Sequence, residues 1–189
     1  MDVGSHQMWF AQSWRAKAGQ TVLTNGGMGP MGCALPSAIG VSLSDGLKPV
    51  WVVVGDGSLQ LNIQELQTAV RHRVPVKIMV INNQALGMLT QFQTENFNGR
   101  LIGSVEGYDA PDFVKVAIAY GLPADRLENE RDIGPKVEWL AAQKGPALLD
   151  VRVPRSFFVL PKSDYNRPVH DMRPRLDEDE MKEALKYAK

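Results

Sequence analysis

Hydrophobic residues gather along this chain in short runs that are rich in valine, isoleucine and leucine, and each run ends in a turn or in polar residues. The four runs occupy residues 21–24, 50–54, 76–81 and 147–153. Continuous apolar runs of this length, separated by stretches with helical spacing, are typical of the buried strands of a parallel sheet. We therefore expect a strand at each of the four places.

Helical spacing appears between these runs. In residues 62–71, for example, Ile63, Leu66 and Val70 fall on one face of a helix. The expected helices span residues 31–44, 62–71, 109–120 and 132–143. Strands that alternate with helices, joined by right-handed crossovers, predict an α/β fold in which a parallel sheet is flanked by helices in three layers.

The chain changes character near its end. Residues 161–174 are polar and proline-rich, without clear periodicity, and Asp177 and Glu180 then have the spacing of a helix capping box. We expect one domain over residues 1–160, followed by a C-terminal arm with a terminal helix over residues 161–189. Such an arm either docks on a partner surface or is a loosely ordered end.

Composition narrows the class of protein. The length of 189 residues suits one domain, and 21 basic against 21 acidic residues give a formal net charge of zero, so neither nucleic acid nor an anionic membrane is expected as a partner. No apolar run reaches the roughly 18–20 residues of a membrane helix. A single cysteine, Cys33, and an N-terminus without the order of a secretory signal predict a cytoplasmic location.

Polar residues follow two of the predicted strands. A Gly-Asp-Gly-Ser turn that contains Asp56 comes directly after the run at 50–54, and an Asn-Asn pair that ends in Asn83 follows the run at 76–81. Ligands of open parallel sheets bind beyond the carboxyl ends of the strands. Carboxylate and amide oxygens suit Mg²⁺ or Ca²⁺, and the glycines permit close approach of a phosphate. Each signal alone is also compatible with a plain strand-end turn.

In combination, the order strand, Gly-Asp-Gly, helix, strand, Asn-Asn resembles the signature of the thiamine-diphosphate enzymes. Further stretches resemble the large subunits of acetolactate synthases, at residues 2–9, 26–32, 35–40, 62–66 and 82–88. The resemblance runs from residue 2 to about residue 160 and corresponds to the C-terminal cofactor domain of that family. It implies thiamine diphosphate and Mg²⁺ as cofactors; flavin is not expected for this chain.

The resemblance also implies roles for individual residues. The Mg²⁺ ligands would be the side chains of Asp56 and Asn83 and the backbone oxygen of Ala85. The cofactor-binding residues would be Gly4, Ser5, His6, Gly29, Met31, Gly57, Ser58, Gly87 and Met88. Of these, Met31 would bend the cofactor, although Met31 and Met88 are also compatible with plain core packing. Phe92 falls where the family places an aromatic residue that controls the acceptor substrate.

Three positions depart from the family pattern. Ser5 stands where these synthases usually have glutamine, Ala85 where they usually have histidine, and Phe92 where tryptophan is common. A backbone ligand at Ala85 is little affected by the change of side chain. The departures leave the acceptor substrate open, but they do not alter the cofactor assignment.

The activity that the resemblance implies is decarboxylation of pyruvate and transfer of the hydroxyethyl unit to a 2-keto acid, as in branched-chain amino acid biosynthesis. In this family a glutamate from a separate pyrimidine-binding domain activates the cofactor, so no catalytic residue is expected in this chain. A homo- or hetero-oligomer is expected, with the chain either an excised domain or one subunit of a split enzyme.

Other functions remain open at this point. One is the β-type subunit of a two-subunit 2-keto acid decarboxylase, such as sulfopyruvate decarboxylase, and another is a non-catalytic assembly module that has kept the fold. A dinucleotide-binding site is not supported, because no Gly-x-Gly-x-x-Gly follows a predicted strand.

Overall fold

The computed structural model describes residues 1–164 and 166–186. The chain forms two compact units, with the boundary between Phe157 and Phe158. The first unit contains the parallel sheet and its helices, and the second contains a short hairpin and a terminal helix. No helix in the described ranges combines the length and the apolar character that a membrane crossing requires.

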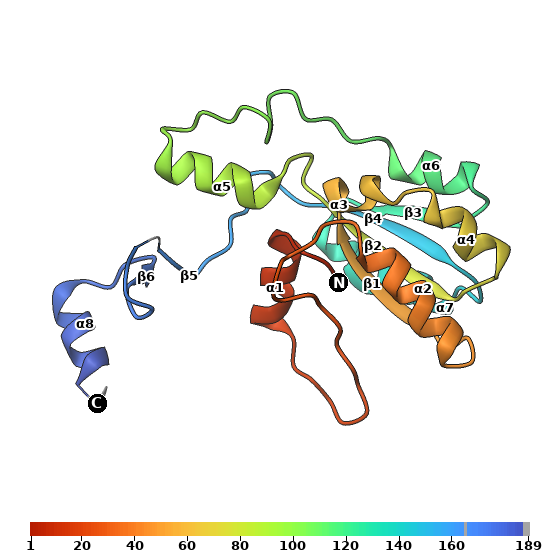
Figure 1. Cartoon of the computed structure of the whole chain (residues 1–189), viewed down its shortest axis with the longest axis horizontal. Coiled ribbons are helices and arrows are strands. Elements are labelled where there is room, and N and C mark those ends of the chain that lie inside the picture. Colours follow the sequence, from red (N-terminus) through yellow and green to blue (C-terminus); the bar gives the residue numbers. More distant parts are fainter. Residues whose placement is uncertain (165, 187–189) are drawn as a thin grey trace. The chain divides into compact units, whose positions relative to one another are not determined.

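A four-stranded parallel sheet forms the centre of the first unit (Figure 1). In chain order its strands are β1 (Val50–Gly55), β2 (Val76–Asn82), β3 (Ala124–Leu127) and β4 (Ala147–Arg152). Their order across the sheet is β1-β2-β4-β3. The strands expected from the runs at 50–54, 76–81 and 147–153 are therefore confirmed as β1, β2 and β4.

Seven α-helices surround or adjoin this sheet in the described part of the first unit. They are α1 (Ser5–Ser13), α2 (Ala34–Ser44), α3 (Asp56–Leu61), α4 (Glu65–Arg71), α5 (Gly87–Asn96), α6 (Phe113–Ala119) and α7 (Ile133–Ala142). A short 3₁₀ turn, Glu130–Asp132, precedes α7.

The two faces of the sheet bury different helices. Side chains of α2, α4 and α6, among them Leu35, Leu66 and Phe113, pack into one core with alternate residues of β1 and β2. On the opposite face, Leu140 of α7 packs with Leu149 of β4 in a smaller core. Because successive strand residues point to opposite faces, both cores come from the same apolar runs. The predicted α/β fold with three layers is confirmed.

The prediction of a strand at residues 21–24 is wrong, and a different segment forms the fourth strand of the sheet. Residues 21–24 lie in a loop where Val22 and Leu23 are 42% and 54% exposed. An isolated apolar run does not make a strand without a neighbour to pair with. The sheet is completed instead by β3, where Asp125 and Arg126 interrupt the apolar pattern and hide the strand from sequence analysis.

Three expected helices begin at least three residues later than the sequence pattern indicates, among them the helix expected at 109–120, which begins at Phe113 after the cap at Asp112. The helix expected at 31–44 begins at Ala34, because Gly32 has a left-handed backbone with a φ of 85°. The helix expected at 62–71 begins at Glu65, after α3 has ended at Leu61. Sequence analysis did not anticipate α1, α3 and α5, which begin within the polar motifs rather than in apolar stripes.

The second unit is built from a small hairpin and a capped helix. Strands β5 (Lys162–Ser163) and β6 (Met172–Arg173) pair in antiparallel fashion within a segment that was expected to be irregular. Helix α8 (Glu178–Leu185) begins with the expected capping box: Asp177 accepts from the backbone of Glu180, and Glu180 accepts from the backbone of Asp177. The predicted cap is confirmed.

Candidate functional site

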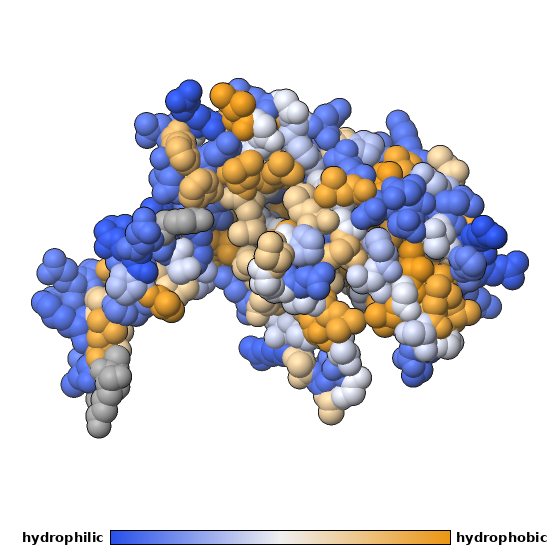
Figure 2. Space-filling model, in the orientation of Figure 1, coloured by the Kyte–Doolittle hydropathy of each residue, from blue (hydrophilic) through white to orange (hydrophobic). Residues whose placement is uncertain are grey.

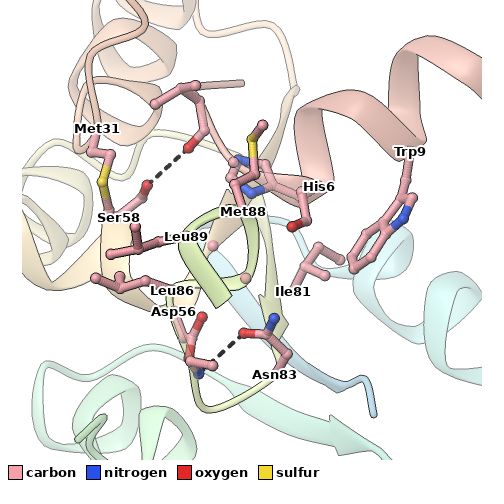
Figure 3. Close-up of a pocket in the computed structure, with 17 residues that line it drawn as sticks. His6, Trp9, Met31, Asp56, Ser58, Ile81, Asn83, Leu86, Met88 and Leu89 are labelled. Atoms are coloured by element: carbon pink, nitrogen blue, oxygen red, sulfur yellow. Dashed lines mark hydrogen bonds between the residues drawn. The ribbon is translucent and has the colours of Figure 1, made fainter. Parts of the chain in front are cut away.

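A pocket opens where β1 and β2 end. The two strands are in parallel register with Gly55 opposite Ile81, so their carboxyl ends lie side by side. After these residues the chain turns at Asp56 into α3 and at Asn83 into the loop before α5. The pocket has a volume of about 260 Å³, and Figure 3 shows the side chains that surround it. Its lining residues are Val3, Gly4, Ser5, His6, Trp9, Met31, Gly55, Asp56, Gly57, Ser58, Ile81, Asn83, Ala85, Leu86, Gly87, Met88 and Leu89.

Asp56 carries a buried oxygen atom that lacks a hydrogen-bond partner. The residue is 3% exposed, and Oδ2 has no partner among the residues that the structure describes. Burial raises the pKa of Asp56, and hydrogen bonds from Tyr108 and from the backbone N–H of Gly57 and Ala85 partly oppose this rise. A buried carboxylate oxygen without a partner is costly, so this atom is suited to binding a cation.

The two asparagines after β2 face different surroundings. Asn83 lines the pocket, and its Oδ1 accepts a hydrogen bond from the backbone N–H of Ala85 at 3.2 Å. Asn82 is fully buried, and its Nδ2 donates to Asp150 Oδ1 at 2.8 Å. Of the pair, Asn83 is therefore the residue that lies in the pocket with Asp56.

The donors that meet in this pocket suit a hard cation. Asp56, Asn83 and Ala85 all line it, which brings a carboxylate, an amide and a backbone segment together. No cluster of three or more His, Cys, Asp or Glu side chains with metal-binding geometry occurs in the described ranges. A mixed oxygen set with few protein ligands matches Mg²⁺, which commonly completes its coordination shell with phosphate oxygens and water.

Two glycines keep the pocket walls free of side chains. A Cβ on Gly87 would lie 2.6 Å from Asn83 Nδ2 and 2.7 Å from Ser5 Oγ. A Cβ on Gly57 would lie 2.8 Å from Leu86 Cδ2. Real Cβ atoms do not approach other atoms this closely, so a larger residue at either position would force the facing side chains to move. The bare backbone also leaves N–H groups accessible to a phosphorylated ligand.

His6 reaches the pocket from the first turn of α1 and is held by Asp2. Its Nε2 lies 3.0 Å from Asp2 Oδ1, and Asp2 Oδ2 in turn accepts from the backbone N–H of Gly32 at 2.8 Å. The other ring nitrogen, Nδ1, faces the end of β1, since a Cβ on Gly55 would lie 3.1 Å from it. The Asp2 side chain thus joins the start of α1 to the loop before α2.

The structure brings most of the expected site residues together. Beside the three candidate metal ligands, those that line the pocket are Gly4, Ser5, His6, Met31, Gly57, Ser58, Gly87 and Met88. Gly29 and Phe92 are not among the lining residues. Gly29 lies next to Val3, since a Cβ on Gly29 would be 3.3 Å from Val3 Cγ2, and Phe92 packs its ring 5.5 Å from that of Phe97.

Sequence reasoning missed other residues of the site. Tyr108 lies beside Asp56 and accepts a hydrogen bond from Gln60 Nε2 at 3.4 Å, and burial together with the charge of Asp56 raises the pKa of Tyr108. It belongs to a loop without a motif, so the sequence carries no signal for it. Trp9 was not among the expected site residues either, and it lines the pocket one helical turn after His6.

A parallel α/β sheet with a buried, unpartnered carboxylate oxygen and glycines at its strand ends is an arrangement suited to a phosphorylated cofactor held through a cation. Comparison with protein families specifies which one. Residues 2–151 match the family described as "Thiamine pyrophosphate enzyme, C-terminal TPP binding domain", and the chain belongs to this family. The expectation of thiamine diphosphate as the cofactor agrees with this result.

Similar proteins include two acetolactate synthases. The mitochondrial catalytic subunit of Saccharomyces cerevisiae is 39% identical over 159 residues, which cover 84% of this chain and 23% of the relative. The large subunit of isozyme 1 of Escherichia coli is 39% identical over 153 residues, which cover 80% of this chain and 27% of the relative. The chain therefore spans about a quarter of the length of these relatives.

Among solved structures, the chain resembles the thiamine diphosphate-dependent 4-hydroxybenzoylformate decarboxylase of Rhodococcus jostii. The TM-score is 0.59 at 29% sequence identity, and the match covers 66% of this chain and 23% of the decarboxylase chain. A thiamine diphosphate enzyme is thus similar in fold as well as in sequence.

Proposed function

We propose that this chain is the cofactor-binding domain of an acetolactate-synthase-like enzyme and that it binds thiamine diphosphate through Mg²⁺ in the pocket at the ends of β1 and β2. The observation that carries the proposal is the unpartnered, buried Oδ2 of Asp56, in a pocket that Asn83 also lines. A cation at this place would compensate the buried charge. The family of the chain and its synthase relatives support the same function.

The proposed Mg²⁺ ligands are the side chains of Asp56 and Asn83 and the backbone oxygen of Ala85. The residues proposed to contact the diphosphate are Gly57, Ser58, Gly4, Ser5 and His6. Gly29, Met31, Gly87 and Met88 are proposed to lie along the rest of the cofactor, and Phe92 is proposed to influence the acceptor substrate. Gly29 and Phe92 lie outside the pocket lining, so these two assignments rest on the resemblance to the family alone.

The chemistry that thiamine diphosphate supplies when bound is an electron sink for decarboxylation of a 2-keto acid. The residues of this chain hold and surround it. Asp56 and Asn83 bind the cation, while Met31, Met88 and Leu89 form an apolar rim to the pocket and are 40%, 42% and 41% exposed. Exposed apolar side chains at the mouth of a site favour a partner surface that covers them and excludes water.

A partner is also required for catalysis in this proposal. Among the described residues that line the pocket, Asp56 is the only acidic one, and it is assigned to the cation. The group that activates the cofactor is therefore proposed to be a glutamate of a pyrimidine-binding domain or subunit in a homo- or hetero-oligomer. Figure 2 shows further hydrophobic residues at the surface, consistent with such an assembly. The cofactor domain is proposed to span residues 1–160, with residues 161–189 as a C-terminal arm.

A two-subunit 2-keto acid decarboxylase is the second candidate. It is favoured by the similarity to a solved structure whose name describes a decarboxylase. The synthase assignment is preferred because the sequence relatives named above are acetolactate synthases. A cytoplasmic location stays a prediction, because the similar synthase of Saccharomyces cerevisiae is a mitochondrial protein.

Calorimetric titration of the chain with thiamine diphosphate, in the presence and absence of Mg²⁺, tests the cofactor assignment. We expect binding that depends on Mg²⁺ and that is lost in Asp56→Ala. The matched control is Asp45→Ala, which removes an exposed carboxylate paired with Lys48. Binding that is equal with and without Mg²⁺, or unchanged in Asp56→Ala, would refute the proposal.

The need for a second domain is tested by activity. We expect the purified chain to decarboxylate pyruvate only marginally, because no acidic group remains free in the described pocket lining to activate the cofactor. Addition of a pyrimidine-binding domain from an acetolactate synthase should increase turnover. Robust acetolactate formation by the chain alone would show that the site is complete without a partner.

A further inference from the structure

The turn that carries Asn83 and Ala85 contains an unfavourable backbone conformation. Gln84, between these two residues, has a φ of 54°, in the left-handed region that residues other than glycine seldom adopt. Such a conformation persists only where surrounding interactions hold it in place. The residues that hold Gln84 therefore determine how Asn83 and Ala85 are presented to the pocket.

Asn82 makes the local interactions that hold this turn. Its Oδ1 accepts from the backbone N–H of Gln84 at 3.2 Å and from Gln84 Nε2 at 2.8 Å. Its backbone oxygen accepts from the N–H of Val153 at 3.0 Å, which continues the pairing of β2 with β4. The first asparagine of the pair thus fixes the conformation of the residue that follows the second.

The side chain of Asn82 is itself held by Asp150 on the neighbouring strand. Asn82 Nδ2 donates to Asp150 Oδ1 at 2.8 Å, and Asp150 is 0% exposed. Because Asn82 uses its amide nitrogen for Asp150, its amide oxygen points toward Gln84 and accepts both hydrogen bonds there. The buried carboxylate therefore sets the orientation of the amide.

Arginine side chains compensate the charge of Asp150. Arg126 Nε donates to Asp150 Oδ2 at 2.9 Å, and Arg152 Nε lies 3.4 Å from the same atom. Arg126 also donates through an NH₂ group to Asp112 Oδ1 at 2.7 Å, at the start of α6. A buried carboxylate with such partners is held in a fixed geometry. Asp150 can therefore serve as a rigid anchor.

We propose that Asp150 and Asn82 are positioning residues for the cation site: Asp150 orients Asn82, and Asn82 holds Gln84 in its left-handed conformation so that Asn83 and Ala85 face the pocket. The inference rests on the proposed function, since it concerns the ligands assigned there. Neither residue lines the pocket. They act through the turn, as residues outside the direct ligands do in other metal sites.

The test is the Mg²⁺ affinity of Asn82→Ala, measured by titrating Mg²⁺ calorimetrically into the full chain in the presence of thiamine diphosphate. Loss of the amide releases Gln84, and we expect the dissociation constant for Mg²⁺ to rise by about 10- to 100-fold. Gln84→Ala provides a second variant that removes one of the two hydrogen bonds to Asn82 at a partly exposed side chain. We expect a smaller rise there, of about 3- to 10-fold.

The matched control is Ile78→Val, which removes part of a fully buried side chain from the same strand at a position that pairs with Leu148 and not with Asp150. It lowers stability, but its Mg²⁺ affinity should stay within about threefold of the unaltered chain. The inference is overturned if Asn82→Ala and Gln84→Ala bind Mg²⁺ as tightly as the unaltered chain, or if Ile78→Val weakens binding equally. Absence of Mg²⁺-dependent binding in the unaltered chain would instead refute the proposed function.

Discussion

Gly87 and Asn83 lie so close together that a methyl group added to Gly87 would force the amide of Asn83 to move: a Cβ on Gly87 would lie 2.6 Å from Asn83 Nδ2. The first residue of α5 therefore restricts where the amide of Asn83 can lie. The same Cβ would lie 2.7 Å from Ser5 Oγ, so the side chain of Ser5 would have to move as well.

Gly87→Ala should displace Asn83 and Ser5 and thereby weaken cofactor binding. We expect the Mg²⁺-dependent affinity for thiamine diphosphate to fall by about tenfold or more, measured by calorimetry. Gly134→Ala is the matched control, because Gly134 lies in α7 with nothing within 4 Å of its Cβ position. That control should change the free energy of unfolding by no more than about 1 kcal/mol and leave binding unchanged. Equal binding by the two variants would contradict the assignment of Gly87 to the site.

Asp56→Asn should stabilise the cofactor-free chain near neutral pH while removing Mg²⁺ binding. Burial raises the pKa of Asp56 above its ordinary value of 3.8, so the folded state disfavours the ionised form. When the pKa is raised in the folded state, ionisation destabilises the fold. This destabilisation is absent at a pH below the ordinary pKa and appears as the pH rises past that value. The stability advantage of Asp56→Asn should therefore grow as the pH rises above about 4 in urea titrations. If Asp56→Asn were less stable than the unaltered chain at neutral pH, the prediction would be wrong.

Phe113→Ala should destabilise the first unit strongly, because Phe113 is 0% exposed in the core beneath α6. The expected loss is about 3–5 kcal/mol in the free energy of unfolding, measured with denaturant. Ile118 belongs to the same helix but is 60% exposed. Ile118→Ala should therefore change stability by no more than about 0.5 kcal/mol. Similar losses in the two variants would show that the assigned faces of α6 are wrong.

Asp177→Ala should loosen the start of α8 without altering the parallel sheet. Its carboxylate accepts from the backbone N–H of Asp179 and Glu180, and its loss should cost about 1 kcal/mol of helix stability. Hydrogen exchange of the full chain should then be faster in the first turn of α8 only. Lys182→Ala, which removes an exposed pair with Asp179, should leave the exchange of that turn nearly unchanged. Unaltered exchange in Asp177→Ala would exclude a role for the cap.

The apolar runs were sufficient to predict β1, β2 and β4 and the layered fold, because buried parallel strands leave a continuous apolar signature. They failed for β3, where Arg126 is a strand residue whose charge is satisfied by Asp150. They failed again at residues 21–24, where an apolar run is exposed. In both places, the presence or absence of a strand depends on whether the segment pairs with a neighbouring strand. The local sequence pattern carries no information about that pairing.

The sequence was sufficient to predict those residues of the candidate site that directly follow a strand. Asp56 and Asn83 could be placed together because each comes directly after a strand of a parallel pair. Tyr108 could not be anticipated, since its loop approaches Asp56 only through the tertiary fold. The partnership of Asn82 with Asp150 was equally hidden, because the two residues are far apart in the sequence and meet only across β2 and β4.

The register of β1 against β2 has a consequence for how sequences of this kind can vary in length. Because Gly55 and Ile81 are ladder partners, the separation of the two oxygen donors that follow them is dictated by backbone pairing and not by the intervening α3 and α4. Insertions or deletions between the two helices should leave that separation intact. Deletion of a single residue within either strand would shift one donor along the ladder and turn the strand's side chains to opposite faces.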